Sequence, residues 1–499
     1  MDSMTGEKEM RGGEDLLNAD YPSDPLSSHK GFAAKWLALS AVGSGFVWAS
    51  VGQGSGELIF WPYLTAKYGL AFVGWILPAC LLQYWVNLEI GRYTVVTGET
   101  IFSGFRRVHP FFVWLLGLMM IPTFLWFGAY ASAGGTALAA LTNLPVGWSE
   151  RAQTLFWAYF TIACFLSFVF FKVVYRGLER FMIAISVSSL LGVFIACFHP
   201  SVAGKVGEYF SAYVRPDIAL PQAWDPKDTR LLITAVTFAG MGGFFNLFYS
   251  YWLRDRGVGM AGTTSPRGDR LVGRVTSPIR GVSQTIPTSG FRVRDTEANR
   301  RSHKMWVRGL MVDNAIGVGI NLFTVSLLGL LAYAILHPIG LVPEGWQIAV
   351  VQARFFGTVW GKVGSAIFLV LSALFLADSW PGVVDGVARM FTDFAGNTFA
   401  RGPDFSFGRW YWRSAGVVAL LTIITLPVAA PGTLLLLQGI LNFVAMVLYC
   451  PLLIWLNFIR LPQMAPAWTR PGLIPLLGIS VATLAYLLLF GWYVRVLFS

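Results

Sequence analysis

The sequence predicts an all-α polytopic membrane protein with about eleven transmembrane helices. Hydrophobic residues make up 55% of its 499 residues and charged residues only 13%, whereas an average soluble domain is about 25% charged. Mean hydropathy is correspondingly high, at +0.59. Apolar runs of about 20 residues recur along the chain, and each is long enough to cross roughly 30 Å of hydrocarbon. Because these runs are continuous and do not alternate, they favour helices over a β-barrel.

The apolar runs divide the chain into a polar N-terminal segment and a series of spans. Residues 1–33 are rich in Gly, Ser, Asp and Glu and are expected to form a disordered cytoplasmic segment. No cleavable signal peptide is expected, because the first apolar run starts late. The predicted spans are residues 36–65, 70–96, 110–140, 152–173, 180–199, 229–253, 307–337, 361–379, 410–429, 432–458 and 472–497.

The distribution of Lys and Arg predicts how the chain is oriented in the membrane. These residues gather in the loops that follow even-numbered spans, and the opposite loops carry few of them. The positive-inside rule therefore predicts a cytoplasmic N-terminus and an outside C-terminus in the plasma (inner) membrane. The most basic loop, residues 254–306, lies in the stretch from Arg254 to Arg308, which holds twelve Lys and Arg against four acids. Topology thus explains the net charge of +11, with contact to anionic lipid as a smaller addition, and nucleic-acid binding is not favoured.

Metal clusters and catalytic groups are not evident in the sequence. The four cysteines fall in or beside apolar runs without metal-ligand spacing, and the five histidines lie at predicted helix ends or in loops. No pairing of a nucleophile with a base stands out. We therefore expect neither an enzyme nor a bound cofactor.

Two predicted spans are interrupted by glycine clusters. In span 1 three glycines within Gly52–Gly56 precede Glu57, and in span 6 three glycines within Gly240–Gly243 precede Asn246. Each glycine costs about 1 kcal/mol in a helix interior. Such a cluster should unwind the helix and free backbone groups, which survive at membrane depth only beside a cavity or a ligand. Close helix–helix packing is the alternative interpretation of each cluster.

The separation of the two interruptions predicts an inverted repeat. They lie in spans 1 and 6, and a repeat of five spans forces the second half into the opposite orientation. Paired interruptions of this kind point to the binding site of a transporter. This is the organisation of the LeuT-type fold, a 5+5 inverted repeat, here with one extra helix. The predicted repeats are residues 34–200 and 201–460, and residues 461–499 hold span 11 and the C-terminus.

The candidate substrate-binding residues follow from these interruptions. Glu57 is the most informative, because a carboxylate inside a membrane is costly and marks a functional site by default. It can bind a cation or an amine, carry a proton, or bridge broken backbone amides. Gln438 in span 10 is either a substrate contact or a polar contact between helices. The full candidate set is Gly54, Ser55, Gly56, Glu57, Gly240, Gly243, Asn246 and Gln438, with Asp313 and Asp378 as candidates for gating or coupling.

Several short motifs, taken in order, resemble those of one known family. Ala66-Lys-Tyr-Gly69, Arg92-Tyr-Thr-Val-Val-Thr-Gly98 and Asn246-Leu-Phe carry the likeness, together with Asp313 and Gln438. Over most of residues 36–460 the sequence resembles the Nramp family of proton-coupled divalent metal transporters, which have the LeuT-type fold. The resemblance places that family's Asp-Pro-Gly-Asn motif on Gly54-Ser-Gly-Glu57.

The sequence departs from the family at the residues that carry its chemistry. The metal-ligating Asp position is Gly54 and the Asn position is Glu57, while Gly243-Phe-Phe245 replaces the Met-Pro-His motif. The acidic proton-relay positions fall near Ala129 and Ser132. Thioether ligands favour soft transition metals, so the remaining oxygen ligands suit a harder ion such as Mg²⁺ better than Mn²⁺ or Fe²⁺.

Together these features predict a secondary-active transporter that works by alternating access. A divalent cation is the first expected substrate, with Glu57 as its metal ligand. A small organic cation or an amino acid is the alternative, because Phe244 and Phe245 add aromatic bulk. A non-transporting membrane sensor or scaffold is the alternative of another class. The expected partners are a small solute and the lipid bilayer, and the sequence leaves the coupling ion, the direction of transport and the oligomeric state open.

Overall fold

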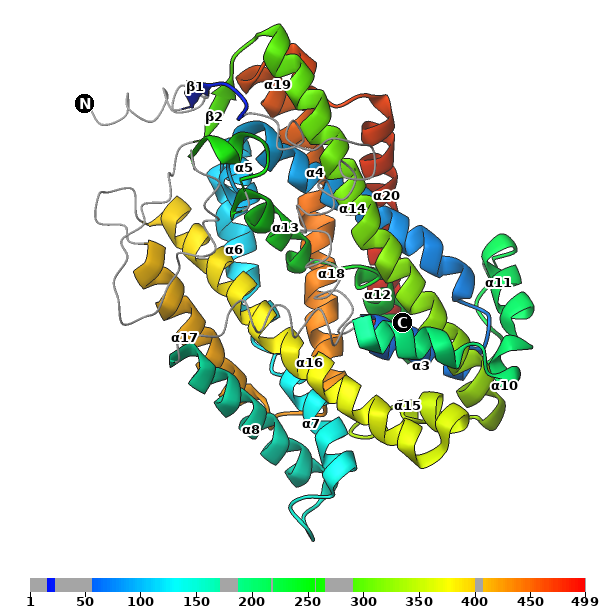
Figure 1. Cartoon of the computed structure of the whole chain (residues 1–499). Helices are drawn as coiled ribbons and strands as arrows, with labels where there is room; N and C mark the ends of the chain where they lie inside the picture. Colours follow the sequence, from blue (N-terminus) through cyan, green and yellow to red (C-terminus); the bar gives the residue numbers. More distant parts are fainter. Residues whose placement is uncertain are drawn as a thin grey trace, which may run out of the picture.

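The structure, a computed structural model, is a bundle of long helices (Figure 1). It describes residues 16–22, 56–170, 187–216, 219–255, 257–264, 290–399 and 407–498. Most buried apolar side chains belong to one continuous core that runs through the bundle. The bundle is therefore built from helix-on-helix packing, as the sequence predicts.

The first half of the chain supplies the helices from the first interruption onward. Its helical elements begin with a π-helical turn, and α4 and α8 are the longest helices of this half within the described residues. The elements are η2 (Gly56–Phe60), α3 (Trp61–Tyr68), η3 (Val73–Trp75), α4 (Ile76–Thr97), α5 (Ile101–Val108), α6 (Pro110–Phe124), α7 (Ala129–Thr142), α8 (Glu150–Phe170), α10 (Pro200–Ala203) and α11 (Val206–Val214).

The second half begins with a short 3-10 turn and ends in a helix of 26 residues. Its elements are η4 (Pro226–Asp228), α12 (Thr229–Thr237), α13 (Phe244–Asp255), η5 (Gly259–Thr264), α14 (Glu297–Leu331), η7 (Ala332–Leu336), η8 (His337–Ile339), α15 (Ile348–Gln352), α16 (Arg354–Thr398), α17 (Phe407–Thr425), α18 (Pro431–Trp455), η9 (Leu456–Arg460), α19 (Leu461–Met464), η10 (Ala467–Thr469) and α20 (Leu473–Phe498).

Several of these helices are long and apolar enough to cross a membrane. Within the described residues there are five such helical stretches, and a sixth if the pair Val187–Ala196 and Pro200–Val214, bent by 76°, is one span. The five stretches are Pro110–Thr142, Glu297–Ile339, Arg354–Thr398, Pro431–Met464 and Leu473–Phe498. They coincide with predicted spans 3, 7, 8, 10 and 11, so the chain is a multi-pass membrane protein.

Helix α16 is longer than its predicted span. The prediction ends span 8 at residue 379, but the helix continues through Pro381 to Thr398. Its backbone leaves the helical region once, at Trp360 and Gly361. The continuation is amphipathic, and Val383, Val387 and Met390 are buried in the core, so packing extends the helix beyond the end of the apolar run. Asp378 therefore lies inside a helix and not at its end.

Helix α14 also begins earlier than predicted, inside the basic loop. It has 35 residues and starts at Glu297, where the side chain of Thr296 accepts a hydrogen bond from the Asn299 N–H. This N-terminal cap satisfies one of the backbone donors that a helix leaves free at its start. The predicted loop 254–306 thus also contains η5, a short strand and the first turns of α14.

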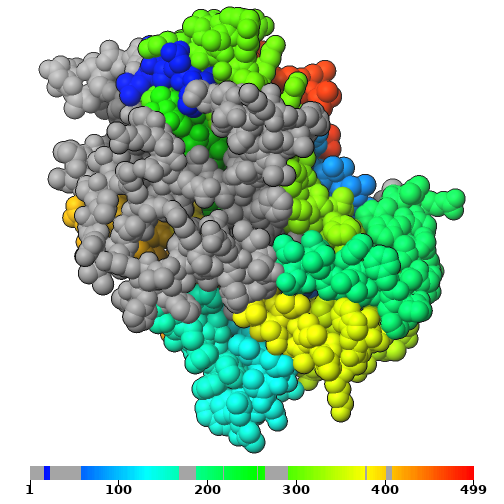
Figure 2. All heavy atoms as spheres, viewed as in Figure 1, coloured from blue at the N-terminus to red at the C-terminus, as the bar shows by residue number. Residues whose placement is uncertain are grey.

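A short parallel sheet joins the N-terminal segment to this loop. Strand β1 (Leu17–Ala19) pairs with β2 (Phe291–Val293), in the register Leu17↔Phe291. The structure therefore differs from the expected disorder of residues 1–33 over this segment. Figure 2 shows β1, in blue, at the surface beside the start of α14. This end of the molecule, which also holds α5, is the predicted cytoplasmic side and is called the inner end below.

Candidate functional site

The predicted interruption of span 6 is present. Helix α12 ends at Thr237 and α13 begins at Phe244, so residues 238–243 are not helical. Gly242 and Gly243 have φ angles of +67° and +60°, which side chains of L-residues rarely allow. Gly240 and Gly243, both predicted site residues, lie in this break. The glycine cluster thus breaks the helix because its backbone adopts conformations that other residues disfavour.

Amide side chains hold this break in place from within the core. The Gly242 N–H donates to Asn246 Oδ1 at 2.9 Å, and Asn246 Nδ2 donates to Gln83 Oε1 at 2.7 Å. Gln83 Nε2 in turn donates to the Thr237 carbonyl at 2.8 Å and to the Tyr486 hydroxyl at 3.1 Å. Gln83 and Asn246 are both 0% exposed. This pair of amides therefore bonds backbone just before the break, at Thr237, and within it, at Gly242, and ties the break to α4 and α20.

Helix α18 completes this set of contacts, which we call the break clamp: Gln83, Asn246, Asn442 and Tyr449. Asn442 Oδ1 accepts from the Phe244 N–H at 2.8 Å, and the Tyr449 hydroxyl donates to the Gly243 carbonyl at 2.8 Å. A Cβ at Gly243 would lie 2.2 Å from both Cβ and Oδ1 of Asn442, so only glycine fits here. Asn246 was predicted to contact substrate, but its amide is bonded within the clamp.

Gln438 has a different environment from Asn246. It is 0% exposed, and neither its amide nitrogen nor its amide oxygen has a hydrogen-bond partner in the described part of the chain. The neighbouring Gly439 lies against the end of α12, because a Cβ there would be 3.0 Å from Phe238. Gln438 therefore carries an unpaired amide one residue from the contact with the helix 6 break. Of the predicted substrate-binding residues with described side chains, Gln438 is the one whose side-chain donor and acceptor have no hydrogen-bond partner.

The predicted interruption of span 1 lies mostly outside the described residues. Gly54 and Ser55 lie outside the described residues, and so does the side chain of Glu57. The backbone of Gly56 and Glu57 forms the start of η2, a π-helical turn. Turns of this type are frequent at functional sites. Gln352 of α15 donates through Nε2 to the Leu58 carbonyl in this turn. An amide side chain therefore binds backbone beside the predicted break of helix 1 as well.

Helices 1 and 6 meet through aromatic side chains. Helix α12 packs against η2, and Phe60 stacks on Phe238 with ring centroids 6.5 Å apart. Phe245 lies 6.0 Å from Phe238, and Phe124 lies 5.8 Å from Phe244 and from Phe245. Phenyl rings therefore surround the helix 6 break. A hollow beside η2, lined by Leu58, Thr136, Gln352 and Ser372 among others, has room for about one water molecule.

An ion pair joins the outer parts of helices 1 and 6. Lys67 of α3 lies 2.7 Å from Asp228, the residue that precedes α12, and the Tyr68 hydroxyl donates to the same carboxylate at 2.6 Å. Asp228 is buried, while the Lys67 side chain is 31% exposed. The outer ends of helices 1 and 6 are thus joined by charge as well as by packing.

The two predicted gating residues lie on different helices. Asp313 of α14 is buried, and its Oδ2 accepts a hydrogen bond of 2.8 Å from the Tyr249 hydroxyl on α13. It therefore joins helix 7 to the inner half of helix 6. Asp378 lies in α16, but its side chain is outside the described residues. Within those residues no three His, Cys, Asp or Glu side chains gather as a metal cluster.

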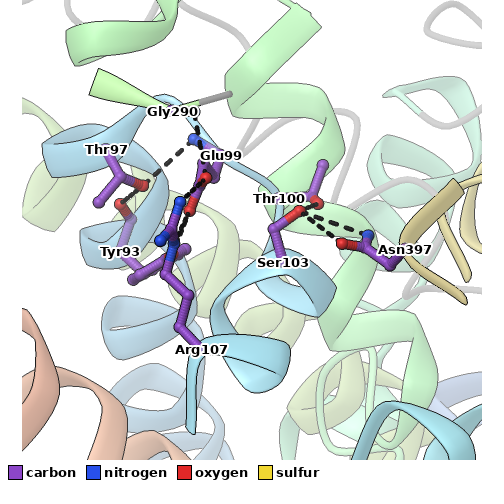
Figure 3. A network of polar contacts seen from close by, with 8 residues as sticks. All are labelled: Tyr93, Thr97, Glu99, Thr100, Ser103, Arg107, Gly290 and Asn397. Carbon is purple, nitrogen blue, oxygen red and sulfur yellow. Dashed lines mark hydrogen bonds and ion pairs between the residues drawn. The ribbon is translucent and has the colours of Figure 1, made fainter. Parts of the chain in front are cut away.

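Sequence reasoning missed a polar network at the inner end, shown in Figure 3. Glu99 accepts from Arg107 at 2.6 and 2.8 Å, from the Gly290 N–H at 3.1 Å and from the Tyr93 hydroxyl. Nearby, Asp393 of α16 accepts from Thr100 and from Tyr251. The network joins α4, α5, α13 and α16. The sequence feature that marks this network is Gly98-Glu99-Thr100, in which a helix-ending glycine precedes an acid. Such a pattern is common in loops and did not stand out.

Comparison with solved structures identifies the architecture. The manganese transporter of Eremococcus coleocola, solved with an aromatic bis-isothiourea compound, matches 96% of this chain and 89% of its own, with a TM-score of 0.60 and 12% identity. MhsT, solved with L-phenylalanine, matches 90% of this chain and 98% of its own, with a TM-score of 0.52 and 16% identity. This chain has the LeuT-type fold. The predicted fold class is confirmed, and at these identities the likeness concerns the fold alone.

Sequence comparison adds nothing to the structural likeness. No protein-family model and no curated protein matches the chain. In the LeuT-type architecture helices 1 and 6 are the first helices of the two five-helix repeats, so the helix 6 break and the predicted break of helix 1 have corresponding positions. Membership of the Nramp family stays a prediction from the sequence motifs.

Proposed function

We propose that this protein is a secondary-active transporter that binds its substrate between the broken helices 1 and 6 and exposes it alternately to each side. The observation that carries the proposal is the break at residues 238–243. The carbonyls of residues 238–241 accept no hydrogen bond from the described part of the chain. Unpaired backbone at membrane depth persists where it lines a cavity or binds a ligand. The orientation is the predicted one, with the N-terminus cytoplasmic.

The roles of the candidate residues divide into binding and positioning. Glu57 supplies the charge, and the carbonyls of the helix 6 break and the Gln438 amide supply neutral polar contacts. Asn246 acts as a positioning residue, because its amide is used within the break clamp. Asp313 supports gating through its bond to Tyr249, which joins helices 6 and 7.

A divalent metal cation is the first substrate class. The Nramp resemblance favours it, and one of the structural neighbours is a manganese transporter. Carboxylate, carbonyl and amide oxygens suit hard ions, so Mg²⁺ fits this donor set better than Mn²⁺. Glu57 is the one acid proposed as a ligand, and the ion would keep part of its water shell, as Mg²⁺ commonly does.

A small organic cation or amino acid is the second substrate class, and a specific observation favours it. The helix 6 break is surrounded by the rings of Phe60, Phe124, Phe238 and Phe245. Phenyl faces attract organic cations and pack against apolar side chains, while Glu57 would pair with an amine. A structural neighbour was solved in complex with L-phenylalanine.

Uptake into proteoliposomes separates these classes. Purified protein would be given Mg²⁺, Mn²⁺ or Ca²⁺ with an encapsulated dye, and radiolabelled L-phenylalanine or tetraethylammonium in parallel. We expect Glu57→Gln to abolish uptake of the accepted substrate and Gln438→Leu to raise KM about tenfold, equivalent to about 1.4 kcal/mol. Gln222→Leu, in an exposed loop, is the matched control and should leave KM unchanged. Uptake that is unaffected by Glu57→Gln would contradict the site, and no uptake of any probe would favour a sensor or scaffold.

A further inference from the structure

The pairing of β1 with β2 is too short to hold the N-terminal segment in place by itself. Strands β1 and β2 have three residues each and form a two-stranded parallel sheet, and isolated two-stranded sheets are at best marginally stable. Two further backbone bonds flank the pairing: the Leu17 N–H donates to the Gly290 carbonyl at 3.1 Å, and the Arg294 N–H donates to the Ala19 carbonyl at 3.0 Å. Side-chain contacts must therefore supply most of the stability of this segment.

Tyr21 is the anchor of the segment. It is 7% exposed and packs in a small apolar cluster with Met260 and Val293. Its hydroxyl lies 3.0 Å from His303 Nδ1, and its backbone N–H donates to Asn299 Oδ1 at 3.0 Å. Burial raises the pKa of the Tyr21 phenol, so the ring stays neutral in this cluster. A buried aromatic ring with a bonded hydroxyl is the typical anchor of a recognition site.

Asp20 adds polar contacts beside this anchor. Its Oδ1 accepts from Asn299 Nδ2 at 2.8 Å, and its Oδ2 lies 2.8 Å from Arg294 Nη1. Asn299 therefore contacts both the Asp20 side chain and the Tyr21 backbone. The Asp20–Arg294 pair is about half exposed on both sides, so it contributes little by itself. The Asn299 contact thus favours an acidic residue before the tyrosine, and the tyrosine ring supplies the buried apolar surface.

The surface that accepts the segment is fixed by the rest of the protein. The Gly290 N–H, at the start of β2, donates to Glu99, which is itself held by Arg107. Phe291 lies against the end of α4, where a Cβ at Gly98 would come within 3.2 Å of its ring. Asn299 and His303 project from the capped first turns of α14. None of these contacts involves residues 16–22, so the acceptor is formed independently of them.

We propose that β2 and the first turns of α14 form a peptide-binding site of the strand-addition type, which takes an extended peptide with an acidic residue followed by tyrosine. The occupant in this structure is the chain's own segment, residues 16–22. Main-chain bonds to a strand edge give such sites affinity, and side-chain pockets give them specificity. The contacts between this segment and the site are all non-covalent, so we expect the segment to exchange with a free peptide of the same chemistry.

Occupancy of this site has a structural consequence for the membrane helices. The predicted span 1 begins at residue 36, and α14 is span 7, so a bound segment links the chain entering helix 1 to helix 7. Occupancy of the site is therefore expected to affect helix 7 directly, through Asn299 and His303. Peptide binding at this site is separate from the choice of transported solute.

Peptide binding to a shortened protein tests the site directly. The protein lacking residues 1–22 is given a fluorescent peptide of residues 14–23, and anisotropy is followed, with detergent micelles alone as the adsorption control. We expect saturable binding, at least tenfold weaker for the Tyr21→Ala peptide and only a few-fold weaker for Asp20→Asn. In the protein, Asn299→Ala should weaken binding, while Arg301→Ala, on the exposed face of α14, should not. Equal binding of a scrambled peptide, or no binding to a shortened protein of unchanged melting temperature, overturns the proposal.

Exchange is tested in the full chain with a disulfide between paired positions. Ala19→Cys and Val293→Cys occupy partner positions in the register, so oxidation should cross-link them. If the segment exchanges, an excess of the free peptide slows cross-linking several-fold, and the Tyr21→Ala peptide does not. A cross-linking rate that is unchanged by the free peptide would show a permanent strand and refute the exchange.

Discussion

At the helix 6 break and in the inner-end network, buried side chains hold backbone and helix ends in place. The two regions differ in whether those side chains are neutral or charged. The break clamp uses two asparagines, a glutamine and a tyrosine, all neutral, whereas the network around Glu99 uses a carboxylate and a guanidinium 2.6 Å apart. The neutral set lies midway along the interrupted helix, and the charged set lies where α4 ends and the loop begins.

The difference follows from the cost of desolvation. A charge at the centre of a bilayer costs about 2.5–3.5 kcal/mol on insertion scales, while neutral amides can satisfy backbone groups without that penalty. Near the membrane boundary a buried ion pair becomes tolerable, but it depends on both partners being present. The comparison predicts that single substitutions should be more damaging in the charged network than in the neutral clamp.

The largest effect is expected for Glu99→Leu. The change leaves the Arg107 guanidinium, which is 12% exposed, without its carboxylate, and it removes the acceptor of the Gly290 N–H. Removing one partner of a buried ion pair typically costs about 3–5 kcal/mol. Thermal unfolding in detergent, followed by circular dichroism, should show a correspondingly large fall in melting temperature. The double variant Glu99→Leu/Arg107→Met should recover part of the loss, and a double variant less stable than the single one would speak against the loss of this ion pair as the cause.

A smaller loss is expected for Gly243→Ala in the clamp. The new Cβ meets a backbone conformation that costs roughly 1–2 kcal/mol for L-residues, and it collides with Asn442, which must then release the Phe244 N–H. Gly340→Ala is the matched control, because Gly340 has φ +62° and no atom within 4 Å of its Cβ position. The difference between the two melting-temperature shifts isolates the collision. Equal shifts would mean that α18 does not hold the break.

Asn246→Leu should lower the free energy of unfolding by about 1–3 kcal/mol, because it leaves the Gly242 N–H and the Gln83 amide oxygen without their hydrogen-bond partner. The proposed role of Asn246 as a positioning residue also predicts a functional signature. In the uptake assay kcat should fall with little change in KM, whereas Gln438→Leu should mainly raise KM. A rise in KM alone for Asn246→Leu would restore Asn246 as a substrate ligand.

The smallest effect is expected at the outer end, for Lys67→Met. Lys67 is 31% exposed, so solvent screens its ion pair with Asp228, and the buried Asp228 carboxylate that remains keeps its hydrogen bond from Tyr68. The loss of stability should stay below about 1 kcal/mol, measured by the same thermal unfolding. A loss as large as that of Glu99→Leu would show that the Tyr68 hydroxyl does not compensate Asp228 for the loss of Lys67.

The sequence predicted the parts of this fold that depend on local composition. Glycine clusters located the helix 6 break, and apolar runs located the long helices, because both signals lie within a few residues. The clamp was missed since Gln83 and Asn246 are 163 positions apart and meet only after the helices pack. For the same reason the sequence could not distinguish a substrate contact from a clamp residue at Asn246, whose residue type fits either role. A three-residue strand such as β1 carries too few residues for a periodic signal.

The length of α14 places its two ends in different surroundings. With 35 residues it is about 50 Å long, well beyond the roughly 30 Å of hydrocarbon that a span must cross. One end packs deep in the bundle and the other carries Asn299 and His303 beneath the N-terminal strand. In the transport cycle proposed above, any tilt of this helix would displace its far end more than the part packed in the bundle. A spectroscopic label placed there would report the position of the membrane core from outside the membrane.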